Sequence, residues 1–184
     1  MINYKLVFWM KKIFIIVFLI FVPLKANAGC DDPLADGVDY TNCRFSDGQD
    51  LAGSYLPNSN LSFAGFIQVN FDKSIMMNSI LAYGSFSESS FIRANLYESN
   101  FQGANLEKSN FTSANLTRVK FIGSSLIEAN FTNSNLFEAD FTSANILNAF
   151  FEGANLNNAT WTNGEKCGPN SIGVCKIIDG NKTE

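Results

Sequence analysis

Large apolar side chains recur at every fifth position along most of the chain. The series begins at Leu51 and continues without interruption to Trp161, as in the segment ANLYESNFQGANLEKSNF that starts at residue 94. The position two residues before each centre is mostly Ala or Ser, and the position just before it is often Asn. A helical face repeats every 3.6 residues and a strand every second residue, so a period of five fits neither. The pattern predicts short extended steps, each followed by a corner, with one large and one small side chain directed inwards.

The identity of the large side chains indicates how many steps close one coil. With four steps, residues twenty apart stack, and from Phe91 onward Phe and Leu alternate between successive steps. Phe would then occupy two opposite walls and Leu the other two, whereas a three-sided coil would mix them. Other even-sided coils also fit the alternation. The columns favour four sides, and one of them reads Leu51, Phe71, Phe91, Phe111, Phe131 and Phe151.

The motif A-N-L-x-x and its variant S-N-F resemble the repeats of the pentapeptide-repeat proteins. The resemblance covers residues 49–163 in one register. It implies an all-β solenoid, namely a right-handed quadrilateral parallel β-helix of about six coils, with a rod length of about 28 Å at a strand spacing of about 4.8 Å. Residues 29–48 and 164–184 are then expected to form short caps and a tail. Each coil gains stability only through its neighbours, so the two ends are the weak points.

A secretory leader is predicted for residues 1–28. Lys11 and Lys12 precede an apolar run at 13–24, which is followed by Ala26-Asn27-Ala28, a small-x-small cleavage site. The run reaches only about 18 Å as a helix and is too short for a bilayer core of about 30 Å. We expect cleavage after Ala28, export to a periplasm, a lumen or the exterior, and no stable membrane span afterwards.

Three alternatives for the leader stay open. Translation could start at Met10, or the leader could remain as an uncleaved anchor. Lipid modification of Cys30 is disfavoured because the segment Asn27-Ala28-Gly29-Cys30 lacks the Leu that such sites carry three residues before the cysteine.

The four cysteines lie in the two predicted caps. A disulfide requires Cα atoms within about 7 Å, and the length of the predicted rod keeps the two pairs apart. We therefore expect bonds Cys30–Cys43 and Cys167–Cys175, which an oxidising compartment favours. Zinc is the weaker alternative, because the spacings of thirteen and eight residues differ from close Cys-x-x-Cys motifs.

The composition excludes several classes of catalytic and binding function. The chain has no histidine, 13 basic and 17 acidic residues, and the leader would remove four lysines and no acid. The absence of histidine rules out His-based triads, His general bases and His ligands, and an acidic mature chain lacks a nucleic-acid footprint. The cluster Asp31, Asp32, Asp36 and Asp39 lacks the spacing of a calcium loop and is expected to be a solvated cap. We expect no enzyme activity, cofactor or metal site.

What remains for function is the outer surface. Contiguous apolar residues on a surface often mark an interface, and two sets are candidates for a partner or for self-association: Ile127, Leu147 and Phe150 on one side, and Met77, Tyr97 and Phe137 on another. We expect a non-catalytic exported scaffold or protein-binding module, with homodimerisation through an end cap or a side wall as one form of binding.

Two other functions are weaker. Some members of the resembling family protect DNA gyrase by mimicking duplex DNA, but here Arg118 and Lys108 interrupt the acidic outer columns. Binding of an envelope polymer would rest on Asn- and Thr-rich walls, and the sequence pattern indicates no aromatic groove.

Overall fold

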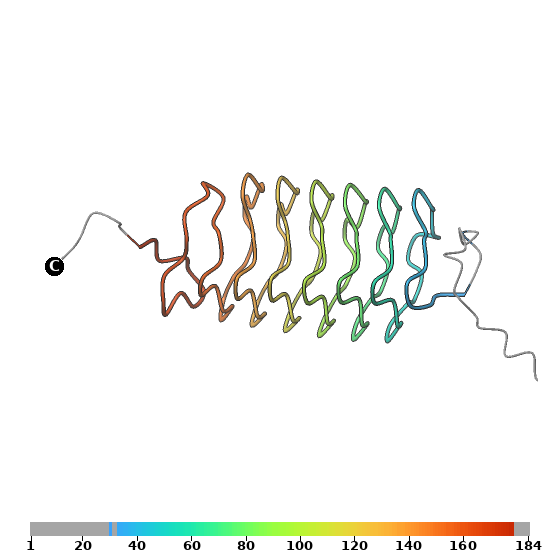
Figure 1. Ribbon diagram of the computed structural model, residues 1–184, viewed down its shortest axis with the longest axis horizontal. Helices are drawn as coiled ribbons and strands as arrows, with labels where there is room; N and C mark the ends of the chain where they lie inside the picture. Colours follow the sequence, from blue (N-terminus) through green and yellow to red (C-terminus); the bar gives the residue numbers. More distant parts are fainter. Residues whose placement is uncertain (1–29, 31–32, 179–184) are drawn as a thin grey trace, which may run out of the picture.

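The computed structural model describes residue 30 and residues 33–178 as a rod of stacked coils (Figure 1). The described part contains no helix and no strand longer than a single bridge residue. Parallel bridges join residues 20 apart on each side of the coil, from Asp50 with Asn70 to Asp140 with Thr160. Four such sides close one coil, so the four-sided parallel β-helix predicted from the columns is confirmed.

Each side consists of one bridge residue, one large buried centre, a two-residue corner and one small buried residue. The backbone N–H of Ala94 donates to the carbonyl of Phe91 at 3.0 Å, which closes a turn whose second corner residue, Arg93, has φ of 57°. This is the left-handed region that a type II turn requires at that position. The bridge residue explains the recurrent Asn, because its side-chain Oδ1 accepts from the N–H two residues later, as Asn110 does from Thr112 at 3.0 Å.

The buried centres form four columns, which we call walls. Wall 1 contains Leu51, Phe71, Phe91, Phe111, Phe131 and Phe151. Wall 2 contains Leu56, Met76, Leu96, Leu116, Leu136 and Leu156. Wall 3 contains Leu61, Leu81, Phe101, Phe121, Phe141 and Trp161, and wall 4 contains Phe66, Phe86, Leu106, Leu126 and Ile146.

Aromatic stacking fills the centre of the rod. Within wall 1 the rings of Phe91 and Phe111 lie 4.9 Å apart at 8°, and those of Phe111 and Phe131 lie 5.1 Å apart at 4°. Rings of opposite walls meet edge to face, as Phe91 and Phe101 do at 5.9 Å and 86°. The predicted stacking of Phe on two opposite walls is therefore confirmed.

The first coil carries one extra residue. Asp39 pairs with Asn60 and Arg44 pairs with Gly65, both 21 residues apart, whereas Asp50 pairs with Asn70 at 20. The extra residue lies between Arg44 and Asp50, where Gly48 has φ of 73°. Parallel pairing thus begins before residue 49, and part of the expected N-terminal cap forms an incomplete coil.

At the other end the chain reverses direction. Antiparallel bridges join Asn155 with Ile172 and Thr160 with Lys166, so the loop after Trp161 folds back over the last coil. This loop covers walls 2 and 3, and its Gly173 lies against the backbone of Phe151 and Gly153 at the corner of wall 1, while wall 4 stays uncovered. A membrane-crossing helix is not found anywhere in the part of the chain that the structure describes.

Candidate functional site

Both expected disulfides are present at the ends of the rod. Cys30 and Cys43 are joined with a Cα–Cα distance of 5.4 Å, and Cys167 and Cys175 with one of 5.0 Å. The four thiols are therefore bonded in pairs and are not available as zinc ligands. Within the described residues, no group of three or more His, Cys, Asp or Glu side chains could hold a metal ion.

The aspartates of the N-terminal segment make structural hydrogen bonds. Asp36 accepts from the side-chain amide of Asn58 at 3.0 Å, and Asp39 accepts from the backbone and hydroxyl of Thr41. Asp31 and Asp32, which complete the cluster in the sequence, lie outside the described residues.

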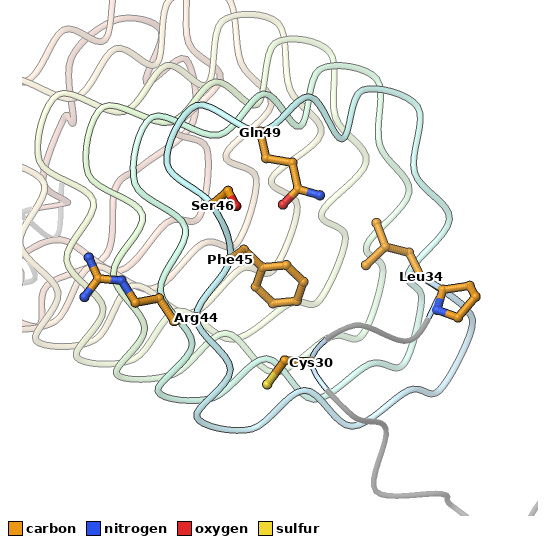
Figure 2. A pocket seen from close by; sticks show the side chains of 7 residues that line it. Cys30, Leu34, Arg44, Phe45, Ser46 and Gln49 are labelled. Carbon is orange, nitrogen blue, oxygen red and sulfur yellow. The ribbon is translucent and has the colours of Figure 1, made fainter.

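The N-terminal end of the rod contains a cavity of about 380 Å³. Figure 2 shows Phe45, Gln49 and Leu34 pointing into the open end of the first coil, whereas Arg44 points away from it. The lining holds one ionisable side chain, Arg44, and no carboxylate. The cavity therefore lacks the paired acid and base that hydrolytic chemistry needs.

The strongest ionic cluster lies on the outside of wall 2. Arg118 donates to Glu138 at 2.6 Å, to Glu98 at 3.1 Å and to the hydroxyl of Tyr97 at 3.1 Å. Hydrogen bonds from Tyr97 and then from Arg118 lower the pKa of Glu98, while the bonds to Glu138 and Glu98 raise the pKa of Arg118. One cation thus balances carboxylates on the coils before and after it, and this column is not a run of negative charge.

Of the two predicted surfaces, the one on wall 2 is interrupted. Met77, Tyr97 and Phe137 follow the buried centres of this wall, and all three side chains are half-buried. Thr117 separates Tyr97 from Phe137, and its hydroxyl bonds to Asn115 and Asn135. The structure therefore does not bring the three residues into one apolar surface.

The second predicted surface lies at the C-terminal end of the rod. Leu147 is 60% exposed and Phe150 is 59% exposed, whereas Ile127, one coil earlier, is half-buried. Ile172, Val174 and Ile178 of the returning loop are also more than half exposed. Apolar side chains thus gather on the last coil and on the loop that follows it.

This end also carries an open backbone edge. In the preceding coil the N–H groups of Leu126, Glu128 and Phe131 donate to carbonyls of the last coil. Their counterparts in the last coil, the N–H groups of Ile146, Asn148 and Phe151, have no acceptor among the described residues. By contrast, the returning loop supplies acceptors on wall 2, where Leu156 donates to Ser171 at 2.8 Å, and on wall 3, where Trp161 donates to Glu165 at 2.7 Å. We call this feature the open edge; it comprises residues 145–153.

Sequence reasoning missed two exposed aromatic residues, Phe63 and Tyr83. Their side chains are 57% and 52% exposed, and their rings stack at 5.2 Å and 13°. Both occupy the second corner position of wall 3, where φ is 59°. Every other non-glycine residue with positive φ in the described chain is polar or charged. Two aromatic residues twenty apart at this corner position could therefore have predicted the exposed pair from the sequence.

Comparisons with known proteins agree with this fold. A family model described as "Pentapeptide repeat region" matches residues 54–131, and one described as "Pentapeptide repeats (8 copies)" matches residues 134–160. No protein of curated function matches the chain.

Solved structures of a plasmid-mediated fluoroquinolone resistance protein, QnrB1, are similar in fold. The full-length form gives a TM-score of 0.63 at 21% identity and covers 67% of this chain and 65% of that one. A trypsin-treated variant gives 0.61 at 22% identity, with 66% and 62% covered. The chain spans less than two thirds of the length of these structures, and the likeness supports the right-handed β-helix alone.

Proposed function

This chain belongs to the pentapeptide-repeat family, and we propose that it is a non-catalytic, exported scaffold that binds a protein partner through the C-terminal end of its β-helix. The observation that carries the proposal is the open edge with Leu147 and Phe150 beside it. An unpaired edge offers main-chain donors in register for an added extended strand, and apolar side chains next to it supply contact area.

The two disulfides support the exported location. Such bonds persist in oxidising compartments and are rare in the cytosol of most organisms. The leader at residues 1–28 lies outside the described residues, so it remains a prediction from the sequence. Cys30 is bonded to Cys43, which leaves no thiol there for a lipid and disfavours the lipoprotein alternative. The proposed location is a periplasm or lumen.

A drug-resistance role of the kind named for QnrB1, acting through DNA mimicry, is the second candidate and is less well supported. DNA mimicry requires continuous negative potential along the rod. Here Arg118 lies between Glu98 and Glu138 and bonds to both. A supercoiling assay with purified gyrase tests this candidate, and inhibition or drug protection at sub-micromolar protein would favour it over the scaffold.

Self-association is the simplest form that binding at the open edge would take. Two copies meeting end to end would each present the same apolar residues, the same N–H donors and, at Ala144 and Ala149, carbonyl acceptors for the other copy's donors, an isologous contact. Sedimentation of the mature chain over a range of concentrations distinguishes a dimer from a monomer that needs a different partner.

The experiment on the proposed function compares two variants in the compartment where the protein is found. A tagged chain with Leu147→Glu and Phe150→Glu is expected to lose its cross-linked partner, because charge at the edge opposes burial. The matched control is Tyr55→Glu, since Tyr55 is 55% exposed but lies near the other end of the rod. Equal capture by both variants, with no dimer in sedimentation, would contradict the proposal.

A further inference from the structure

A surface groove of about 320 Å³ opens on wall 4 beside the exposed aromatic pair. Phe63 and Ile67 line its apolar part, and Arg44 and Asp47 line its polar part. Gly65 and Ser85, which pair in a parallel bridge, lie between them. Because these two residues have no side chain or a small one, little fills the space above the backbone except the stem of Arg44, whose Cγ lies 3.6 Å from the place of a β-carbon on Gly65.

Phe63 lines this groove, and its side chain is 57% exposed. Tyr83 covers one face of the Phe63 ring and continues the stack along the rod. The corner preceding Phe63 in this column is Asn42, whose N–H donates to the carbonyl of Ser62 at 2.9 Å. Asn42 lines the same groove. The aromatic stack therefore ends at Phe63, and a planar or flat group placed over that ring would extend it.

The backbone around the groove is closed to strand addition. The N–H of Gly65 donates to Cys43 at 2.9 Å, that of Phe66 to Ser85 at 2.7 Å, and that of Ser85 to Ala64 at 2.9 Å. The bridge between Gly65 and Ser85 therefore offers no unpaired amide to an extended peptide, in contrast to the open edge at the C-terminal end. A protein partner is therefore a poor match for this surface.

The charges around the groove favour a neutral ligand with many hydroxyl groups. Arg44 and Asp47 are both exposed, and neither forms an ion pair within the described residues. Their charges offset each other, which disfavours a phosphate or an acidic polymer. Together they provide donors and an acceptor at the rim of an aromatic face, and hydroxyl groups require both.

We propose that this groove binds a neutral saccharide unit, with the apolar C–H face of the sugar ring on Phe63 and its hydroxyls bonded to Arg44 and Asp47. The volume lies at the lower end of the range for small-molecule sites, about 300–1,000 Å³, and fits one or two rings. The site lies on wall 4 near the N-terminal end and does not depend on the open edge. If the chain binds an envelope polymer, this groove is the place where we propose that it does so.

The test is an NMR titration of the ¹⁵N-labelled chain with chitotriose, cellotriose and maltotriose. We expect at least one of them to shift the amides of Gly65 and Ser85, at about 10 mM sugar for a dissociation constant of about 1 mM. Phe63→Asn is expected to weaken binding about 10-fold, because it removes the stacking face. Asn occupies this column at Asn42 with φ of 62°, and Asn58 and Asn133 adopt the same left-handed corner conformation, so the fold should tolerate the change.

Two further variants separate a sugar site from a general apolar contact. Arg44→Gln and Asp47→Asn should each weaken binding about 3-fold, through lost charged hydrogen bonds, while Tyr55→Asn should have no effect. Absence of amide shifts with all three sugars would overturn the proposal. Equal affinity of the Phe63→Asn variant, checked for an unchanged unfolding midpoint, would also overturn it. Since neither outcome involves Leu147 or Phe150, failure here is distinct from failure of the proposed protein interface.

Discussion

Tyr83 lies against Gly103 on the next coil, so close that a β-carbon built on Gly103 would come within 2.6 Å of the tyrosine ring. Gln102 adds a side-chain hydrogen bond of 3.3 Å to the Tyr83 hydroxyl. The ring is thus held between Phe63 below and a glycine above. Replacement of that glycine tests the packing of the aromatic corner directly.

Gly103→Ala is expected to destabilise the protein more than Gly123→Ala. Both glycines have positive φ, of 65° and 64°, so the backbone cost of about 1 kcal/mol is shared. Only Gly103 faces a ring, because nothing lies within 4 Å of a β-carbon at Gly123. Urea unfolding measures the difference. Adding Tyr83→Asn to Gly103→Ala should remove the excess, and an equal loss in both single variants would contradict the contact.

Removal of a central ring should cost more than removal of a terminal one. Phe111 is fully buried between Phe91 and Phe131, so Phe111→Ala is expected to cost about 3–5 kcal/mol of unfolding free energy. Phe151 is only half-buried and has one neighbour in its column, and Phe151→Ala should cost about 1–2 kcal/mol. Similar denaturant midpoints for the two variants would argue against continuous stacking.

The ionic cluster around Arg118 predicts that the contribution of Glu98 to stability falls as the pH is lowered. The folded-state pKa of Glu98 is lowered from its ordinary value of 4.5, first by Tyr97 and then by Arg118. Its stabilising contribution is therefore present above pH 4.5 and is lost as the pH falls through the lowered pKa. The effect on stability should be small, because the cluster is exposed.

Carboxyl NMR titration provides the measurement for this cluster. Tyr97→Phe and Arg118→Gln should each move the Glu98 midpoint towards 4.5, since each variant removes one of the hydrogen bonds that lower its pKa. An unchanged midpoint in both variants would show that neither bond forms in solution.

Loss of the C-terminal disulfide should open the end of the rod without affecting its centre. The double variant Cys167→Ser and Cys175→Ser removes a loop constraint worth about 2–3 kcal/mol. Amides that depend on the returning loop, those of Leu156 and Asn158, should then exchange faster with solvent. Phe91 is the internal control, and faster exchange there would mean that the loop stabilises the whole stack.

Export can be checked by mass. The chain expressed in a bacterium with its own leader should appear in the periplasmic fraction with a mass that begins at Gly29 and with no free thiol. Retention of residues 1–28, or a lipid mass on Cys30, would replace the predicted location with a membrane anchor.

The architecture could be predicted from the sequence because large and small side chains recur with a fixed period of five residues. Phe91, Phe111 and Phe131 lie twenty residues apart, and a coil of four five-residue steps places them over one another. The extra residue before Asp50 corresponds in the sequence to a six-residue step between the buried residues Phe45 and Leu51.

The surface was predictable only in part, because exposure depends on the neighbouring coils and caps. Leu147 and Phe150 were identified from their positions, but their exposure comes from a loop that covers the other sides of the last coil and leaves wall 4 uncovered. The predicted surfaces consisted mainly of residues at the first corner position, so they did not include Phe63 and Tyr83, which lie at the second and more exposed one. The open edge could not be foreseen, since the direction of the chain after Trp161 is not encoded in the repeat.

The separation of Phe and Leu onto alternate walls has a consequence for how such a molecule could change length. From Phe91 onward, excising ten residues would turn everything beyond the cut by half a revolution, yet Phe would still fall on Phe and Leu on Leu. Excising five would force rings against aliphatic chains throughout the remainder. The core therefore tolerates the loss of ten residues, but the outer surface does not. Such an excision between the groove and the open edge would place these two surfaces on opposite sides of the rod, although the core would stay well packed.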